Sequence, residues 1–206
     1  MMMKKVWLIA LLWLVNMAQA GLYMGAGVGM MHHNDELDTN SSVVNGGKAL
    51  MTGSFLLGYQ PMQRDTKKNN FFVDFGLNLA PQDNDVATES GVTYNIKTDA
   101  EVMMRIGSMF PASKNLYPYV FGALVYDIGV NLDGANSVTS STSSQDIMSF
   151  GGGVGVRGFA GEHGFYDFSY LYHHAADESF GTYTNSDPIN FTLNQGLFVA
   201  AIGYMF

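Results

Sequence analysis

Hydrophobic and polar residues alternate with a period of two along most of the chain after residue 20. In segment 71–79 the odd positions are Phe, Val, Phe, Leu and Leu, and the even positions are Phe, Asp, Gly and Asn. A β-strand turns successive side chains to opposite faces, so this spacing predicts a half-exposed strand. The same alternation predicts seven further strands. They lie at residues 21–31, 49–59, 92–110, from 117 onward, 147–159, 166–173 and 196–206.

The connections between these strands fall into a short and a long class. Short turns are expected around residues 60–70, 111–115 and 160–164. Longer polar connections are expected at residues 32–48, 80–91, 129–146 and 175–188. Alternating short and long connections are typical of an up-and-down barrel, and an even strand count places both chain ends on one side. The sequence therefore predicts an all-β fold, an eight-stranded antiparallel up-and-down barrel.

The charged residues of the predicted strands share a face with glycine, serine and asparagine, and the opposite face is apolar. They are Asp74, Lys97, Asp99, Glu101, Arg105, Arg157 and Asp167. A charge on the lipid face of a barrel costs about 2–4 kcal/mol near the midplane, whereas acids and bases inside a barrel can pair. This pattern is the reverse of a soluble barrel and predicts a transmembrane barrel with a charge network inside. The network is either a static filling or a gate whose ion pairs exchange partners and open a narrow pore, and the static filling is the favoured interpretation.

The first twenty residues have the pattern of an export signal. Two lysines and an apolar run at residues 6–15 precede a small-x-small motif that ends at Ala20. We expect cleavage between Ala20 and Gly21, with a signal peptide at 1–20 and a barrel domain at 21–206. An uncleaved N-terminal anchor is the alternative, but no stop-transfer pattern follows the apolar run.

Charge and cysteine content narrow the function classes. The whole chain has 10 Lys and Arg residues against 18 Asp and Glu residues, and loss of the first twenty residues removes two lysines and no acids. The remaining eight basic and 18 acidic residues give a net charge of −10. An acidic chain without a basic cluster is a poor nucleic-acid binder. The absence of cysteine excludes disulfides and any cysteine-ligated metal site.

The final strand ends on an aromatic residue and carries apolar or small residues at every second position. These positions are Phe198, Ala200, Ile202, Tyr204 and Phe206. This ending resembles the closing strand of bacterial outer-membrane barrels, in which the C-terminal pattern is the signal that the barrel assembly machinery reads.

Four segments extend this resemblance over the chain after residue 20. They are GLYMGAGVG at 21–29, LYPYVFGALVY at 116–126, FGGGVGVRGF at 150–159 and LFVAAIGYMF at 197–206. The chain is similar to the OmpA-like and opacity-type eight-stranded outer-membrane barrels. The resemblance implies a bacterial outer-membrane location with both ends of the mature chain in the periplasm, surrounded by outer-membrane lipid and lipopolysaccharide. It implies no particular activity, since such barrels serve as anchors, adhesins, channels and enzymes.

Aromatic residues near the predicted strand ends fit interfacial girdles. They are Tyr23, Tyr59, Phe71, Tyr94, Tyr117, Tyr119, Tyr172, Tyr204 and Phe206. The alternative is that these residues are ordinary strand formers.

Two histidine pairs end the first and seventh predicted strands. His32 and His33, with His173 and His174, would meet at one region of the rim, where imidazole and carboxylate ligands suit zinc, nickel or copper. The spacing lacks a tight ligand motif, so exposed loop histidines are the favoured interpretation.

A lipid hydrolase needs a serine, a histidine and an acid on one face of a strand near the rim. His173, His174, Glu178 and Ser179 are the candidates, but the serine lacks the two-residue spacing from a histidine that an alternating strand requires.

The long connections are acidic and the short turns are basic. The acids are Asp35, Glu36, Asp38, Asp83, Asp85, Glu89, Asp133, Asp146, Asp177, Glu178 and Asp187, and the bases of the turns are Arg64, Lys67, Lys68 and Lys114. Acidic loops would attract divalent cations that bridge to lipopolysaccharide phosphates, or a basic host surface; solubility alone is the simpler explanation. We therefore expect a monomeric, non-enzymatic barrel without a cofactor, with an envelope or adhesin-like role. The alternatives are a narrow channel for ions or small solutes and an outer-leaflet lipid hydrolase.

Overall fold

The computed structural model describes the backbone of most of the chain that follows residue 20. The described residues are 21–33, 35–39, 42–46, 49–60, 69–79, 84–89, 92–135, 144–182 and 188–206. Side chains are described for residues 21–32, 49–60, 69–79, 98–130, 146–175 and 192–206. Residues 1–20, the predicted signal peptide, lie outside the described residues. The signal peptide and its cleavage after Ala20 therefore stay predictions.

Twelve strand segments make up the described secondary structure. They are β1 (Leu22–His33), β2 (Asp35–Thr39), β3 (Ser42–Gly46), β4 (Ala49–Tyr59), β5 (Asn70–Leu79), β6 (Asn84–Glu89), β7 (Val92–Lys97), β8 (Ala100–Met109), β9 (Leu116–Ala135), β10 (Ser144–Ala160), β11 (Gly164–Thr182) and β12 (Pro188–Met205).

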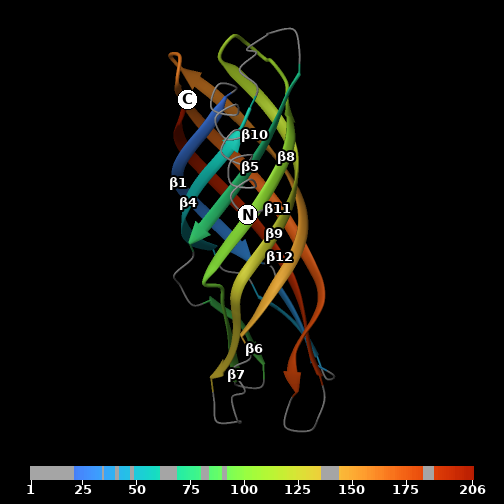
Figure 1. Ribbon diagram of the computed structural model, residues 1–206. Helices are drawn as coiled ribbons and strands as arrows, with labels where there is room; N and C mark the ends of the chain where they lie inside the picture. The colour runs from blue at the N-terminus through green and yellow to red at the C-terminus, as the bar shows by residue number, and fades with distance from the viewer. Residues whose placement is uncertain are drawn as a thin grey trace, which may run out of the picture.

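Eight of these segments form a closed antiparallel barrel. The order is β1-β4-β5-β8-β9-β10-β11-β12, and β12 pairs back onto β1 from Tyr23↔Met205 to His33↔Gln195. Figure 1 shows the strands tilted around a common axis, with the C-terminus near one end and β6 and β7 at the other. The predicted fold class, an eight-stranded up-and-down barrel, is confirmed.

The long connections contain more strand than the sequence pattern predicted. Segments 32–48 and 80–91 hold β2, β3 and β6, and β9 and β11 extend well into 129–146 and 175–188. The sum of paired residue numbers stays constant from β1–β12 into β2–β12, so β2 continues the first strand in the same register. We call the end of the barrel that carries β2, β3, β6 and β7 the hairpin end. The opposite end, with residues 111–115 and 161–163, is the turn end.

The predicted fourth strand, 92–110, is interrupted. β7 and β8 keep one register against β9, from Lys97↔Asn131 to Ala100↔Ile128, but the chain bends at Thr98 and Asp99. Gly129 lies opposite this bend with a φ of +67°, a conformation that glycine adopts without steric cost. The bend resets the alternation, so Thr98 is buried and Asp99 is exposed.

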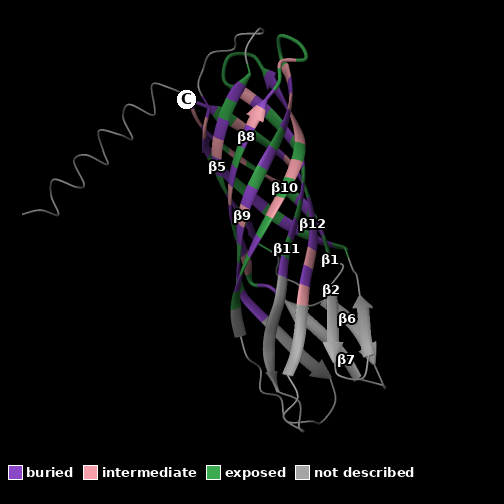
Figure 2. Cartoon of the chain, turned by 90° about the vertical axis from the view of Figure 1, so that its right-hand side faces the viewer, coloured by how far each residue is buried: buried purple, intermediate pink, exposed green. Residues whose placement is uncertain are grey.

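Burial alternates residue by residue along the barrel strands (Figure 2), as the period-two pattern predicts. On β9 the sequence analysis placed Tyr119 in an interfacial girdle, but Tyr119 points into the barrel together with Phe121, Ala123 and Val125. Both faces of β9 are apolar, so hydrophobicity alone did not distinguish them.

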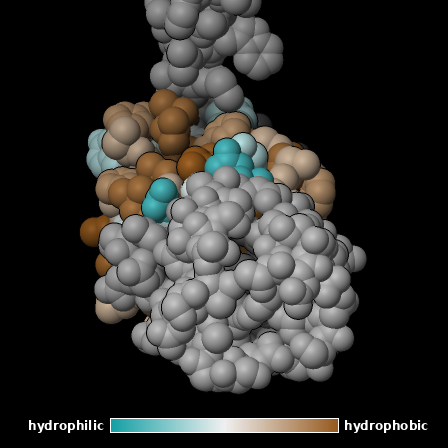
Figure 3. All heavy atoms as spheres, turned by 90° about the horizontal axis from the view of Figure 1, so that it is seen from below, coloured by the Kyte–Doolittle hydropathy of each residue, from teal (hydrophilic) through white to brown (hydrophobic). Residues whose placement is uncertain are grey.

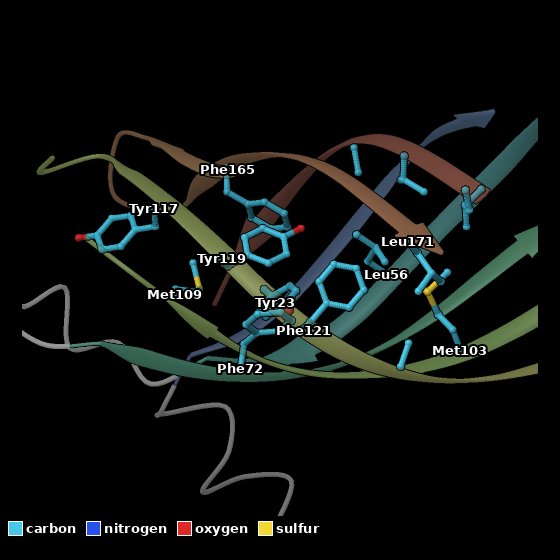
Figure 4. Packing of buried hydrophobic residues seen from close by; sticks show 14 of the residues in the cluster. Tyr23, Leu56, Phe72, Met103, Met109, Tyr117, Tyr119, Phe121, Phe165 and Leu171 are labelled. Atoms are coloured by element: carbon cyan, nitrogen blue, oxygen red, sulfur yellow. The ribbon is translucent and has the colours of Figure 1, made fainter. Parts of the chain in front are cut away.

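Large aromatic side chains fill the interior (Figure 4). Phe72 and Tyr119 pack edge to face with ring centroids 5.1 Å apart, and Tyr23 and Phe165 do so at 5.4 Å. Glycine on the neighbouring strand β10 makes room for the Phe121 ring, because Gly153 is paired with Phe121 in register. A Cβ on Gly153 would collide with the Phe121 ring and the Tyr170 carbonyl oxygen. An eight-stranded barrel is narrow enough for side chains to fill it, and this one is filled.

Candidate functional site

The outer wall of the barrel is apolar between its two rims. Large hydrophobic side chains on it are 36–73% exposed, and Ile202 is the most exposed of these. Seen from the hairpin end, hydrophobic residues cover much of the visible described wall (Figure 3). Among the described side chains, charged groups on the outside occur only at the rims: Asp99 and Asp146 at the hairpin end, and Lys114 and Glu162 at the turn end. An exterior of this kind suits the hydrocarbon of a membrane.

The turn-end half of the interior contains a network of charges. Arg105 donates to Asp74 through two nitrogens, Nε to Oδ1 at 2.7 Å and Nη2 to Oδ2 at 2.9 Å. The Tyr23 hydroxyl donates to Asp74 Oδ2 at 2.6 Å. Asp74 and Arg105 are directly paired in the β5–β8 register, so the sheet itself places the bidentate ion pair.

A second ion pair lies across the lumen from the first. Arg157 Nε donates to Asp167 Oδ2 at 2.8 Å, and the Tyr119 hydroxyl donates to Asp167 Oδ1 at 2.7 Å. Arg157 Nη2 lies 3.6 Å from Asp74 Oδ2, which connects the two pairs. We call Asp74, Arg105, Arg157 and Asp167 the ionic plug. Its two bases and two acids balance in charge.

Aromatic rings surround the Arg157 guanidinium. Its Cζ lies 4.3 Å from the ring centroid of Tyr23, 5.1 Å from that of Phe165 and 5.4 Å from that of Phe72. Cation–π contacts strengthen when water is excluded. Arg105 also reaches across the barrel, where its Nη1 donates to Ser169 Oγ at 3.2 Å. These contacts hold the plug in place.

The hairpin-end half of the interior holds a different polar set. Ser54 Oγ donates to Asn78 Oδ1, and Asn78 Nδ2 donates to Glu101 Oε1 at 2.6 Å. Glu101 Oε2 lies 3.3 Å from His173 Nε2, and His173 Nδ1 is hydrogen-bonded to Ser149 Oγ at 2.8 Å. All five side chains are buried. We call them the hairpin-end cluster.

The structure buries five of the seven charged residues that the sequence placed in the barrel interior. Asp74, Arg105, Arg157 and Asp167 form the plug, and Glu101 belongs to the hairpin-end cluster. Asp99 is a correction, because the bend opposite Gly129 turns its side chain outward. The side chain of Lys97 lies outside the described residues.

Sequence reasoning missed several interior polar groups. Asp127 is fully buried and stands directly beside Glu101 in the β8–β9 register. It lies on the same face as Tyr119 and Phe121, so its charge was the available signal that this face of β9 points inward. Ser149 and His173 lie on the inward positions of their strands, but the sequence analysis placed His173 at the rim.

Three of the predicted girdle aromatics are corrections. Tyr23, Tyr117 and Tyr119 are inside the barrel, because their strands place odd-numbered residues inward. The predicted positions that are exposed on the outer wall are Phe71, Tyr172, Tyr204 and Phe206. Tyr59 is half-buried, and the side chain of Tyr94 lies outside the described residues. On the closing strand, Phe198, Ile202, Tyr204 and Phe206 are exposed and Ala200 is partly exposed.

The histidines do not converge as a rim metal site. His173 points into the lumen, whereas His174 is exposed and bonded to Asn194 through its Nδ1 at 2.8 Å. His32 is exposed, and the side chain of His33 lies outside the described residues. Within the described part of the chain, no group of three His, Asp or Glu residues is placed to hold a metal ion.

The four candidate hydrolase residues do not form a site among the described side chains. His173 and His174 face opposite sides of β11, and the side chains of Glu178 and Ser179 lie outside the described residues. His173 contacts both Ser149 and Glu101, but all three side chains are enclosed by the barrel wall. No described helix is long and apolar enough to cross a membrane.

The chain was compared with protein families, curated sequences and solved structures. Neither a protein-family model nor a curated protein sequence matches it. Among solved structures, Neisserial surface protein A (NspA) is similar over 90% of this chain and 97% of its own, at 16% identity and a TM-score of 0.49. The outer-membrane protein AlkL aligns over 91% of this chain and 90% of its own, at 14% identity and 0.48. The Yersinia pestis attachment invasion locus protein Ail aligns over 91% and 99%, at 10% identity and 0.47. Likenesses this distant assign no function.

Proposed function

We propose that this protein is an integral barrel of the bacterial outer membrane that acts through its outward-facing end and carries out no chemistry. The observation that carries the proposal is the division of side chains: an apolar wall without described charges between the rims, around an interior in which buried acids and bases pair. Each unpaired charge on the lipid face would cost about 2–4 kcal/mol, so this division suits a bilayer.

The orientation follows from the two ends of the barrel. Short turns face the periplasm and longer hairpins face the outside in bacterial barrels, so the hairpin end would be extracellular. Both ends of the mature chain would then be periplasmic. The sequence of the hairpins is acidic, which favours an envelope role through divalent cations and lipopolysaccharide phosphates, or contact with a basic host surface.

The filled interior argues against a static pore. Contacts cross the lumen in both halves, from Arg105 to Ser169 and from Glu101 to His173. A conducting state would require these contacts to break, with two buried arginines and two buried aspartates losing partners. That rearrangement is costly in a low-dielectric interior.

Single-channel recording tests the closed interior. The full-length chain is expressed, and the barrel is extracted from the outer membrane and inserted into a planar bilayer. Heat-modifiable gel mobility verifies that it is folded. We expect no discrete conductance steps from the folded wild-type barrel. Steps that change in size in Arg105→Gln or Arg157→Gln would overturn the proposal and identify a channel gated by the plug.

Two further assays address the surface role. Replacing the acidic hairpin residues Asp35, Glu36 and Asp38 with Asn, Gln and Asn should weaken adhesion or lipopolysaccharide binding while gel mobility still reports a folded barrel. The mass of lipid A should be identical in cells that express wild type, His173→Ala or His174→Ala. A mass change that needs either histidine would contradict the absence of enzymatic activity.

A further inference from the structure

The hairpin-end cluster contains the one cross-lumen contact described whose charge changes near neutral pH. The Glu101–His173 contact is an ion pair only when the imidazole is protonated. Histidine is the side chain whose ordinary titration falls between pH 5 and 8. Arginine and aspartate stay charged over that range, so the ionic plug keeps its charges while the hairpin-end cluster does not.

Both partners of this contact are held in place by neighbouring strands. Glu101 on β8 accepts a hydrogen bond from Asn78 on β5, which in turn is bonded to Ser54 on β4. His173 on β11 is bonded to Ser149 on β10. Three strands therefore position the carboxylate and two strands position the imidazole, from opposite parts of the wall.

Acidic and neutral side chains face His173 from the strands around it. Glu101 approaches it from β8, and Asp127 on β9 stands beside Glu101 in register. The described neighbours on β10 and β12 are neutral: Ser149, and Gln195, which is paired with His173 in register. Attraction between opposite charges is strong where water is excluded. Protonation adds a positive charge among anions, and deprotonation removes that attraction.

We infer that Glu101 and His173 form a proton-operated latch that ties β8 to β11 across the hairpin end of the lumen. When His173 is protonated, the latch is an ion pair and stiffens the end from which the hairpins extend. As the pH rises through the titration of His173, the latch weakens and the plug beneath it is unchanged. This inference goes beyond the proposed surface role, because it makes the stability of the outward end depend on pH.

Thermal unfolding at two pH values tests the latch. Barrels are purified from cells expressing the full chain, and unfolding is followed by circular dichroism and gel mobility at about pH 5.5 and pH 8, in urea that brings the transition into range. We expect the wild-type midpoint to be higher at the lower pH by about 3–6 °C. The shift should be absent in His173→Gln and in Glu101→Gln.

His174→Gln is the matched control. His174 is the next residue on the same strand and is exposed, so this variant should keep the wild-type shift. If His173→Gln does not fold, Glu101→Gln decides the result, because its amide oxygen still accepts from Asn78 but carries no charge. A wild-type midpoint that does not depend on pH, a shift that survives in Glu101→Gln, or its loss in His174→Gln would each overturn the inference.

Discussion

The fully buried guanidinium of Arg157 contacts two carboxylates and several aromatic rings. Burying a charge is expensive, and only close partners repay that expense. Asp167 lies opposite Arg157 in the β10–β11 register, and Asp74 approaches from across the lumen. Arg157 therefore joins the two ion pairs of the plug.

Arg157→Met removes the positive charge and leaves Asp167 buried without it. We expect a loss of about 3–5 kcal/mol in the free energy of unfolding, as for other buried ion pairs that lose one partner. Both tryptophans of the chain precede residue 20, so urea unfolding of the mature barrel in lipid vesicles is followed by circular dichroism and gel mobility. The double variant Arg157→Met/Asp167→Asn should be more stable than the single variant. A double variant that is less stable would show that charge compensation is not what Arg157 provides.

Gly153 and Gly122 provide a matched pair of substitutions on the two faces of the wall. A Cβ at Gly153 would collide with the Phe121 ring and with backbone, whereas a Cβ at Gly122 meets open space. We expect Gly153→Ala to destabilise the barrel by about 1–3 kcal/mol through overpacking. Gly122→Ala should change stability by less than about 1 kcal/mol. Equal effects in the same unfolding assay would mean that interior packing is not limited by these glycines.

Residue charge predicted the interior better than residue size did. Charge together with the period-two alternation placed five residues inside, because a charge on the lipid face of a barrel is costly: Asp74, Glu101, Arg105, Arg157 and Asp167. Aromatic residues carry no such signal, since tyrosine and phenylalanine suit both the filled core and the outer wall. Tyr23 and Tyr119 lie at inward positions of their strands, where their hydroxyls donate to Asp74 and Asp167 on distant segments.

The apolar outer wall ends on the β9–β10 hairpin near Asp146. Asp146 is the first charged residue on the outer face of β10 beyond Met148. Its Oδ1 accepts from the Gly129 amide at 3.0 Å, and its Oδ2 accepts from the Tyr126 hydroxyl at 2.9 Å. The β-ladder is irregular here, with a register shift between Gln145 and Ile147. The Asp146 side chain ties the two strands where their backbone pairing is disturbed.

The hydrogen bond from the Gly129 amide, followed by that from Tyr126, lowers the pKa of Asp146 below its ordinary value. A carboxyl group with a lowered pKa contributes stability above its unfolded-state pKa and loses that contribution as the pH falls through the folded-state pKa. We expect the Gly129 amide resonance to titrate with Asp146, at a pH below the ordinary titration range of an aspartate, and its hydrogen exchange to become faster there. Asp146→Asn should abolish the titration. Glu162→Gln, a charge change at the opposite rim, should leave it in place; a titration that persists in Asp146→Asn would contradict the assignment.

Strand existence was predictable where one face of the strand is apolar and was not predictable elsewhere. β5 and residues 165–173 of β11 alternate, with an aromatic or apolar side chain at every second position on the outer face. The hairpin-end segments β3 (SVVNG) and β6 (NDVATE) do not alternate apolar with polar residues, and the sequence predicted loops there. Strands beyond the apolar wall need no apolar outer face, so their sequences need not alternate between apolar and polar residues. Only pairing with a neighbouring strand defines these elements. The bend at Asp99 was missed for the same reason.

At the scale of the whole molecule, closure of the barrel and filling of its interior reinforce one another. The β1–β12 ladder leaves no free edge among the eight barrel strands, and the plug and the hairpin-end cluster link opposite walls from within. The sequence predicted the closed eight-stranded barrel, because the count and the order of alternating segments determine it. The cross-lumen partners could not be predicted, since they depend on strand tilt and on which side chains reach across.

Site-directed spin labelling in lipid vesicles tests most directly that the apolar wall faces a membrane. The chain has no cysteine, so single cysteines introduced at Val154, Phe75 and Ile202 are the only labelling sites in each variant. Asp146→Cys, on the same strand as Val154, and Lys114→Cys serve as rim controls. We expect labels at the three wall positions to collide with oxygen, which concentrates in lipid, and to be shielded from a water-soluble nickel complex, with the reverse at the rims. Nickel access at Val154 and Ile202 equal to that at Asp146 would contradict the membrane barrel.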